Sequence, residues 1–253
     1  MSKTNCGCVP QRDGEPAIND LPTESPYTSL QVGYSSTVER VAEELRRALF
    51  EGELAPGTPL REIALAEQIG VSRSTIREAL GSLVAEGLAS RAPNRGVTVN
   101  ELNPDDVRDV CRARVALEVA GVRRWDLAAE SQHDAVRAAL ADFTRVAGSR
   151  ADTSTLTAAH LAIHRALVGL TGSDRLLAVA DGLGAEVRLA LAHVDRMRRN
   201  AREQVVSHRD LVLLLEAGQI EAAVAELEHH LAGAQRSMLE AIHEPPRRRD
   251  APS

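Results

Sequence analysis

Four histidines stand at spacings that could assemble a metal site. His160 and His164 lie four residues apart, so on a helix their side chains project from the same face. His208 and His230 flank Gly218 at ten and twelve residues, which is about 15 Å and 18 Å of helix, so an antiparallel hairpin would return them to one level. A lone helical histidine is more often a surface or satisfied residue than a ligand. The paired spacing of these four favours a metal site, whereas no such spacing supports His133, His193, His229 or His243.

A helical second half has to position these side chains. Asn103 and Pro104 followed by Asp105 and Asp106 are typical of a helix start, and this helix should run towards Trp125. Apolar spacing predicts further helices over residues 133–147, 153–171, 173–199, 202–217 and 219–242. No strand alternation interrupts them, so we expect an all-helical bundle of six or seven helices.

The stretch from residue 64 to 86 predicts two short helices joined by a tight turn. Gly70 stands where the first helix needs a left-handed terminal residue, and Ser72 can cap the second. The apolar face of the second helix leaves polar side chains exposed on its first turns, namely Arg73, Ser74, Thr75 and Arg77. Arginine can bridge guanine O6 and N7 in the major groove, and hydroxyls can reach base edges or phosphates. The pattern favours a helix-turn-helix, although a solvated amphipathic hairpin gives the same pattern.

The flanking segments support the DNA-binding interpretation. Residues 88–91 and 97–99 have strand character and enclose a turn with a basic tip, as a wing requires, and its candidate contacts are Asn94, Arg95 and Gly96. Apolar residues from 38 to 49 predict a supporting helix. A turn at 56–59 then leads to Arg61, a further candidate for contact with DNA.

Composition excludes several classes of protein. The chain has 253 residues, 43% of them hydrophobic and only 2% aromatic, which favours helices packed through alanine, leucine and valine. It contains no apolar run long enough for a membrane span and begins without an apolar signal core, so we expect a cytoplasmic protein that does not contact membranes. The net charge of −6 does not favour nucleic acid, but arginines gather at the groove-facing elements. Three cysteines argue against a disulfide framework.

Residues 38–99 resemble the winged helix-turn-helix domain of the GntR family of transcription regulators. The resemblance is carried by EGELAPGTPLREIALAEQIGVSRSTIREALGSLVAEGL and NRGVTV. It implies a DNA-binding regulator, most simply a repressor, that binds a palindromic operator in double-stranded DNA as a homodimer. The family commonly has a basic residue near Arg61 that touches the DNA backbone. Some relatives have another two places later, where this chain has Ile63.

The second half resembles the FCD effector-binding domain of the FadR subfamily. RARVALE, HLAIHRALVGLTGSDRLL and HRDLVLLLEAGQIEAAVAELEHHL carry this resemblance. It implies a divalent metal that the family holds with one aspartate and three histidines. The three family histidines match His164, His208 and His230, and this chain has His160 where the family has the aspartate. Four imidazoles favour Zn²⁺ or Ni²⁺ over Mn²⁺. Family effectors are small organic or sugar acids, bound with help from a helix arginine, for which the candidates are Arg114 and Arg188.

Two consequences of the four histidines remain open at this point. Because a neutral histidine replaces the family's negatively charged aspartate, the metal site should be more positive than in the family and should attract a small carboxylate effector more strongly. If all four held Zn²⁺ tetrahedrally, no position would stay free and the metal would be structural. The alternative function is then a DNA-binding regulator or architectural protein whose helical half serves only dimerisation.

An enzyme is not expected. A metalloprotease helix needs His-Glu-x-x-His, and Leu161 and Ala162 follow His160 here. Walker loops, nucleophile elbows and dinucleotide fingerprints are absent from the sequence. The predicted fold is mainly α, with a disordered leader over residues 1–35, a winged helix-turn-helix domain over 36–100, an FCD-like effector and metal domain over 103–243 and a polar tail over 244–253.

Overall fold

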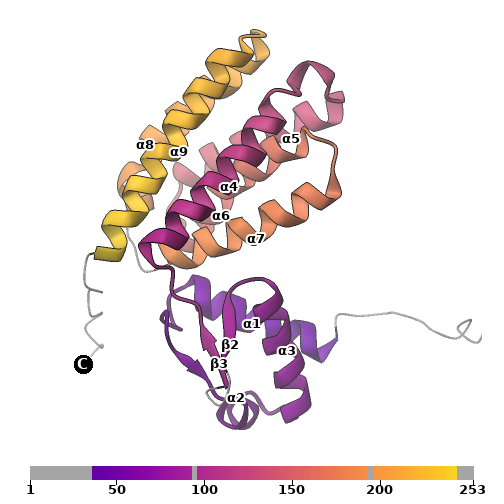
Figure 1. Cartoon of the computed structure of the whole chain (residues 1–253), viewed down its shortest axis with the longest axis vertical. Coiled ribbons are helices and arrows are strands. Elements are labelled where there is room, and N and C mark those ends of the chain that lie inside the picture. Colours follow the sequence, from indigo (N-terminus) through magenta and orange to yellow (C-terminus); the bar gives the residue numbers. More distant parts are fainter. Residues whose placement is uncertain (1–35, 93–95, 193–195, 244–253) are drawn as a thin grey trace, which may run out of the picture. The chain divides into compact units, whose positions relative to one another are not determined.

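The computed structural model of the chain describes residues 36–92, 96–192 and 196–243, so the predicted leader and tail lie outside the described residues. The N-terminal part of the described chain has three helices and a small antiparallel sheet (Figure 1). Its elements are α1 (Thr37–Phe50), β1 (Pro59–Leu60), α2 (Glu62–Ile69), α3 (Arg73–Ala85), β2 (Ala89–Ala92) and β3 (Gly96–Val99). Strand β3 lies in the middle of the sheet, in the order β1-β3-β2.

Local signals fix both ends of the turn between α2 and α3. Gly70 ends α2 with φ of 76°, a left-handed conformation that glycine adopts without steric cost. The Ser72 hydroxyl accepts a hydrogen bond from the Thr75 backbone N–H at 3.1 Å and so caps α3. The predicted helix-turn-helix is confirmed. Strand β1 was expected as a turn, and its two residues pair only with β3, where Leu60 lies opposite Val97.

The apolar residues of α1 and α3 build the core under the sheet. Helix α3 buries Ile76, Leu80 and Leu83 completely, while Arg73 and Arg77 stay exposed. Helix α1 contributes Leu45 and Leu49 to the same core, together with Leu88, Val97 and Val99 from the sheet region. Burial on one face therefore determines which side of α3 remains free.

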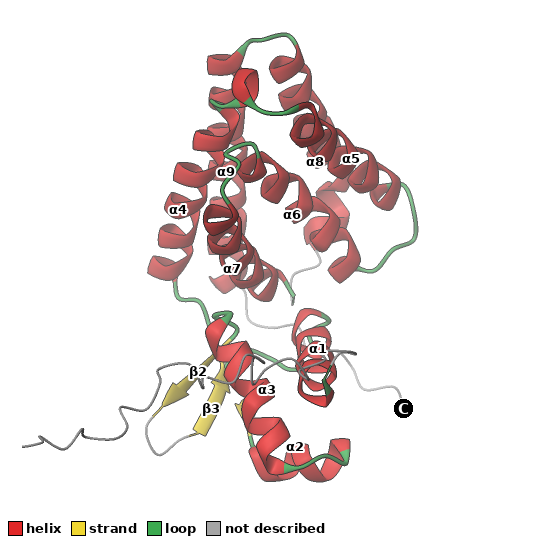
Figure 2. Cartoon of the chain, turned by 90° about the vertical axis from the view of Figure 1, so that its right-hand side faces the viewer, coloured by secondary structure: helices red, strands yellow, loops and turns green. Residues whose placement is uncertain are grey.

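The second half is a helical bundle, as predicted (Figure 2). Its elements are α4 (Pro104–Val122), the 3₁₀ turn η1 (Trp125–Leu127), α5 (Glu130–Ala147), α6 (Thr153–Gly169), α7 (Asp174–Leu191), α8 (Arg196–Glu216) and α9 (Ile220–His243). The single helix expected over 173–199 is wrong, because α7 ends at Leu191 and α8 already begins at Arg196. Helix α4 begins at Pro104, as predicted, and a capping box that the sequence analysis did not predict fixes this end: Asn103 accepts from the Asp106 backbone N–H at 3.0 Å.

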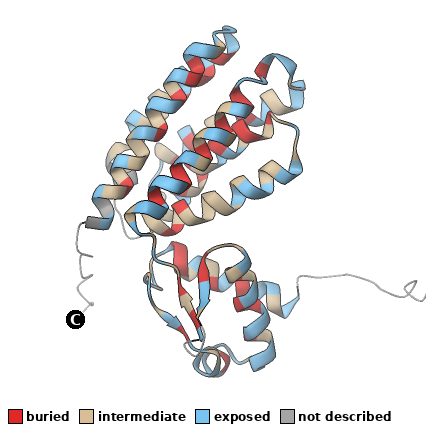
Figure 3. Cartoon of the chain, in the orientation of Figure 1, coloured by how far each residue is buried: buried red, intermediate tan, exposed pale blue. Residues whose placement is uncertain are grey.

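Helix α6 occupies the centre of the bundle, since it packs against α4, α5, α7 and α8. Figure 3 shows buried and exposed residues side by side along the helices of the bundle, and the buried residues of α6 include Ile163 and Leu167, which are both 0% exposed. Helix α4 approaches α6 closely at Gly121, where an added Cβ would lie 1.9 Å from the Leu167 carbonyl oxygen. The absence of a side chain at Gly121 therefore allows α4 and α6 to pack this closely.

Two expectations from composition can be compared with these elements. Among the described residues, no helix combines the length and the apolarity needed to cross a lipid bilayer. Cys111 is buried in α4, and burial raises the pKa of its thiol, as expected of a small apolar core residue. Cys6 and Cys8 lie outside the described residues.

Candidate metal centre and DNA-binding face

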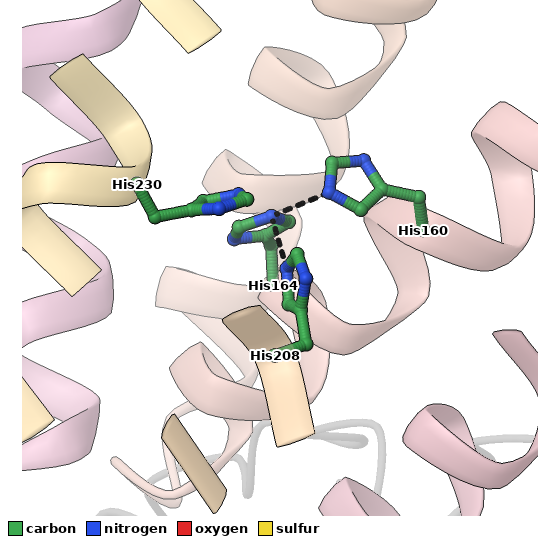
Figure 4. Close-up of side chains that lie close together, drawn as sticks. All are labelled: His160, His164, His208 and His230. Carbon is green, nitrogen blue, oxygen red and sulfur yellow. Dashed lines mark hydrogen bonds between the residues drawn. The ribbon is translucent and has the colours of Figure 1, made fainter. Parts of the chain in front are cut away.

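The four predicted histidines come together inside the bundle. Helix α6 supplies His160 and His164, α8 supplies His208 and α9 supplies His230, and the rings point toward one another (Figure 4). One nitrogen from each ring lies within 4.8 Å of all the others. His160, His164 and His208 are 6%, 4% and 1% exposed, while His230 is partly buried. The four histidines therefore lie together, as the helical spacing and the hairpin about Gly218 predicted.

Three of the rings are oriented through their outer nitrogens. His208 Nδ1 lies 2.7 Å from the Gln204 carbonyl oxygen, which can only accept a hydrogen bond. The ring proton is therefore on Nδ1, and Nε2 carries a lone pair. His164 Nδ1 lies 2.7 Å from Glu118 Oε2. His230 Nδ1 lies 3.4 Å from the Ser207 hydroxyl, which donates to Glu226 Oε1 at 2.9 Å. Outer partners of this kind are typical of metal-binding histidines, because they fix the tautomer.

The inner nitrogens fit a cation. His164 Nε2 lies 3.3 Å from His160 Nε2 and 3.2 Å from His208 Nε2. With the protons on the outer nitrogens, the lone pairs of His164 and His208 face each other and repel. Zn–N bonds of 2.0–2.1 Å in a tetrahedron separate the nitrogens by about 3.3–3.4 Å, close to both distances. These histidines therefore fit a divalent metal. In a tetrahedral site, the nitrogens that are as far as 4.8 Å apart would have to move closer, to about 3.3–3.4 Å.

Burial keeps the four imidazoles neutral, as metal binding requires. Desolvation lowers the pKa of His208 to about 4 and that of His230 to about 3. It also lowers the pKa values of His160 and His164 well below the ordinary range, and in His160 the neighbouring histidines lower it further. Neutral imidazole is the form that coordinates metals, so at physiological pH these four side chains need not lose a proton before they can bind an ion.

A buried ion pair supports His164 from behind. Arg114 Nε donates to Glu118 Oε1 at 2.9 Å, and the two side chains are 5% and 3% exposed. Burial raises the pKa of Glu118, while Arg114 lowers it. Arg114 was among the residues predicted from the sequence, whereas Glu118 was not. The spacing of four residues between them in RARVALE is the signal that could have found it.

A cavity of about 570 Å³ adjoins the cluster. Among the described residues, five buried side-chain atoms lack a hydrogen-bond partner, and four of them belong to residues lining this cavity: Arg114 Nη2, His160 Nδ1, Gln204 Oε1 and His230 Nε2. Buried polar groups are rarely left unpaired, so these atoms could bind a polar ligand or water in the cavity. The second arginine candidate, Arg188, does not line this cavity and donates to Ser154 Oγ at 2.8 Å.

The remaining histidines are consistent with ordinary roles where the structure describes them. His133 stacks on Trp125 with ring centroids 4.1 Å apart, and its Nε2 lies 2.9 Å from the Trp125 carbonyl oxygen. His229 is exposed on α9 and is not part of the four-histidine cluster.

Only some of the predicted DNA-contacting residues are exposed in the structure. Arg61, Arg73 and Ser74 are exposed. Thr75 is partly buried, and its hydroxyl lies 2.8 Å from the Ser72 hydroxyl that caps α3. Ser72 also lies 2.7 Å from the Ser74 hydroxyl.

Arg77 has a protein partner that the sequence did not reveal. Its Nη2 lies 2.9 Å from Glu62 Oε2, which links α3 to α2. In the wing, Gly96 begins β3 with φ of 78°, whereas the other two wing candidates, Asn94 and Arg95, lie outside the described residues.

Comparison with known proteins identifies both halves. The family described as bacterial regulatory proteins, gntR family, matches residues 37–99, and the FCD domain matches residues 109–233. A protein of Paenarthrobacter nicotinovorans named "Probable D-xylose utilization operon transcriptional repressor" is 33% identical over 81% of this chain and 90% of its own length. The Nta operon transcriptional regulator of Aminobacter aminovorans is 30% identical over 69% of this chain and 81% of its own.

Solved structures agree with these matches. A GntR transcriptional regulator from Rhodococcus sp. RHA1 has a TM-score of 0.71 and 28% identity, covering 82% of this chain and 99% of that one. Escherichia coli McbR/YncC, with a TM-score of 0.62 and 21% identity over 83% of this chain and 98% of its own, shares the fold. The two named relatives and the Rhodococcus protein are all described as transcription regulators. This chain is therefore a DNA-binding transcription regulator of the GntR family, with an N-terminal winged helix-turn-helix domain and a C-terminal FCD domain of the FadR type.

Proposed function

We propose that this regulator is a homodimeric repressor whose FCD domain binds a divalent metal and a small organic or sugar acid, and thereby controls binding to a palindromic operator. The observation that carries the proposal is the set of facing Nε2 atoms of His160, His164 and His208 at 3.2 and 3.3 Å beside a polar cavity. A cation between the rings would remove the repulsion between the facing lone pairs of His164 and His208 in this set.

The first turn of α3 is the proposed reading surface. Arg73 and Ser74 project from the capped end of the helix, as a major-groove contact requires. Arg77 is exposed, and solvent screening weakens its surface ion pair with Glu62, so it can exchange this partner for a phosphate or a guanine. Arg61 and the wing residues Asn94, Arg95 and Gly96 would add contacts to the backbone.

The metal would be held by His160, His164, His208 and His230, with Zn²⁺ as the first candidate and Ni²⁺ as the second. A bound metal would supply positive charge for an anionic oxygen. Arg114 would supply a second anchor, because it lines the cavity and its Nη2 has no partner among the described residues. Arg188 does not line this cavity, although it lines a second one of about 310 Å³ together with Arg114 and His164, so it is the weaker candidate for contact with the effector.

The cavity lining favours an acid that also carries hydroxyl groups. Ser207, Glu226 and Gln204 lie on its wall near His230 and offer hydrogen-bond acceptors as well as donors. Sugar acids combine a carboxylate with several hydroxyls. One similar protein is named as a repressor of D-xylose utilization, and D-xylose shares the hydroxyl groups of a sugar acid but not its carboxylate.

The DNA-binding half of the proposal is tested with Arg73→Ala and fluorescently labelled DNA from the chain's own genomic neighbourhood. We expect a loss of operator affinity of 5-fold or more, on the order of 1–3 kcal/mol for a bidentate base contact. Arg108→Ala is the matched control, because it removes the same charge from an exposed position on α4. Equal affinities of wild type and Arg73→Ala would refute the assignment of α3.

The sensing half is tested by elemental analysis and thermal shift. The double variant His164→Ala/His208→Ala should purify without divalent metal, whereas His133→Ala should retain it. In a screen of sugar acids and dicarboxylates, at least one compound should then raise the Tm of the wild type and leave the Tm of the double variant unchanged. If the wild type holds metal but no acid raises its Tm, the alternative applies, in which four histidines hold a structural zinc in a domain that serves dimerisation.

A further inference from the structure

His160 differs from the other three histidines in how it is held. His164, His208 and His230 each have a partner at Nδ1: a carboxylate, a backbone carbonyl and a hydroxyl. His160 Nδ1 is buried and has no hydrogen-bond partner among the described residues. A ring neighbour of His160 outside the cluster is Phe143, with centroids 5.3 Å apart, and its side chain offers no polar atom.

This difference affects how firmly each ring can serve a metal. An outer hydrogen bond fixes the ring orientation and makes the inner nitrogen a better ligand, and its loss typically costs 10–100-fold in metal affinity. His164, His208 and His230 therefore form a supported tripod. His160 lacks this support and is the weakest of the four potential ligands.

The position of His160 adds a second, independent observation. His160 and His230 line the 570 Å³ cavity, whereas His164 and His208 do not. Arg114 lines the same cavity, and its unpartnered Nη2 is available to a carboxylate there. A ligand in this cavity therefore has both the unsupported ring of His160 and the side chain of Arg114 among its lining residues.

We propose that His160 is an exchangeable ligand, which coordinates the metal when the cavity holds no acid and leaves when a carboxylate binds. The proposal rests on the metal site of the proposed function. In the exchange one metal–nitrogen bond breaks and one metal–oxygen bond forms, His160 leaves as a neutral imidazole, and no electron or proton is transferred. The exchange would allow a four-histidine site to be closed in the free protein and still bind an acid directly.

Cobalt binding tests this proposal without any measurement of DNA binding. Metal-stripped wild type is titrated with Co²⁺ in parallel with His160→Gln and His164→Gln, and the visible absorption of the bound ion reports both affinity and coordination number. We expect His160→Gln to lose about 10-fold in affinity or less, and His164→Gln to lose 100-fold or more, because the latter removes a supported ligand. His160→Ala serves as a second variant if glutamine coordinates, and circular dichroism checks that each variant is folded.

Acetate is then added to the Co²⁺-loaded proteins as the carboxylate probe. In the wild type, acetate should change the spectrum without releasing Co²⁺, and in His160→Ala the half-saturating acetate concentration should fall, since no histidine has to be displaced. Two results would overturn the inference alone: His160→Gln and His160→Ala losing Co²⁺ as completely as His164→Gln, or acetate binding His160→Ala no better than wild type. A wild type that binds neither Co²⁺ nor Zn²⁺ would instead refute the metal site itself.

Discussion

Acidifying the metal-free protein should destabilise the helical bundle, because its buried histidines can accept protons only after unfolding. Burial lowers the pKa of His208 to about 4 and that of His230 to about 3. An unfolded histidine has a pKa near 6.5. Above that value both states are neutral and stability is fully present. As the pH falls below 6.5 the unfolded chain binds protons that the folded chain does not, and stability is lost down to the folded pKa values.

The magnitude follows from the difference in proton binding. Between pH 7 and pH 5, each histidine that stays neutral in the folded state costs about 2 kcal/mol, so His208 and His230 together cost about 4 kcal/mol. His160 and His164 act in the same direction, since burial also lowers their pKa values. This loss is a large part of the 5–15 kcal/mol that stabilises a typical domain.

The assay uses Trp125, the single tryptophan of the chain, which lies buried in the bundle and reports on its unfolding. Urea unfolding with a chelator present is followed by fluorescence at pH 7 and pH 5. In His230→Gln the difference between the two pH values should shrink by about 2 kcal/mol. If wild type has the same stability at both pH values, these histidines are not buried and neutral, and the reasoning fails.

Three further changes give distinct results. Gly121→Ala should destabilise the bundle by roughly 1–3 kcal/mol or more, because the new Cβ would meet the backbone of α6, whereas Gly182→Ala, with no atom within 4 Å of its new Cβ, should be neutral or stabilising in thermal unfolding. Glu118→Gln should weaken Zn²⁺ binding by about 10–100-fold in competition with a chromophoric chelator, and wild-type affinity would show that the carboxylate does not support His164. Ser72→Ala removes the cap of α3 and should cost about 0.5–2 kcal/mol in the unfolding of the small domain, while an unchanged midpoint would contradict the capping role.

Local chemistry explains why much of the fold could be predicted from the sequence. Gly70 and Ser72 end and begin helices through interactions with residues at most three or four positions away, so their roles are readable in the chain itself. The boundary between α7 and α8 was mispredicted because residues 185–217 contain neither glycine nor proline to mark it. Strand β1 was missed because it depends on pairing with β3, almost forty residues later.

The same distinction applies to the site. His160 and His164 were predictable from helical spacing, and His208 and His230 from the hairpin about Gly218. Their supporting partners were not, because the contact between His164 and Glu118 spans 46 residues and depends on how α4 packs on α6. The ion pair of Arg77 with Glu62, fifteen residues earlier, likewise arises from the packing of α3 on α2.

Coupling between the acid site and DNA binding is the central claim, and one measurement tests it directly. A compound that raises the Tm of the metal-loaded wild type, but not that of His164→Ala/His208→Ala, is added at saturation while the Kd for operator DNA is measured at fixed salt. An allosteric coupling of typical size predicts a change in Kd of about 5–150-fold in the wild type, and none in the double variant. An unchanged Kd in the wild type at saturating compound would contradict the account, because the FCD domain would then bind its ligand without controlling DNA.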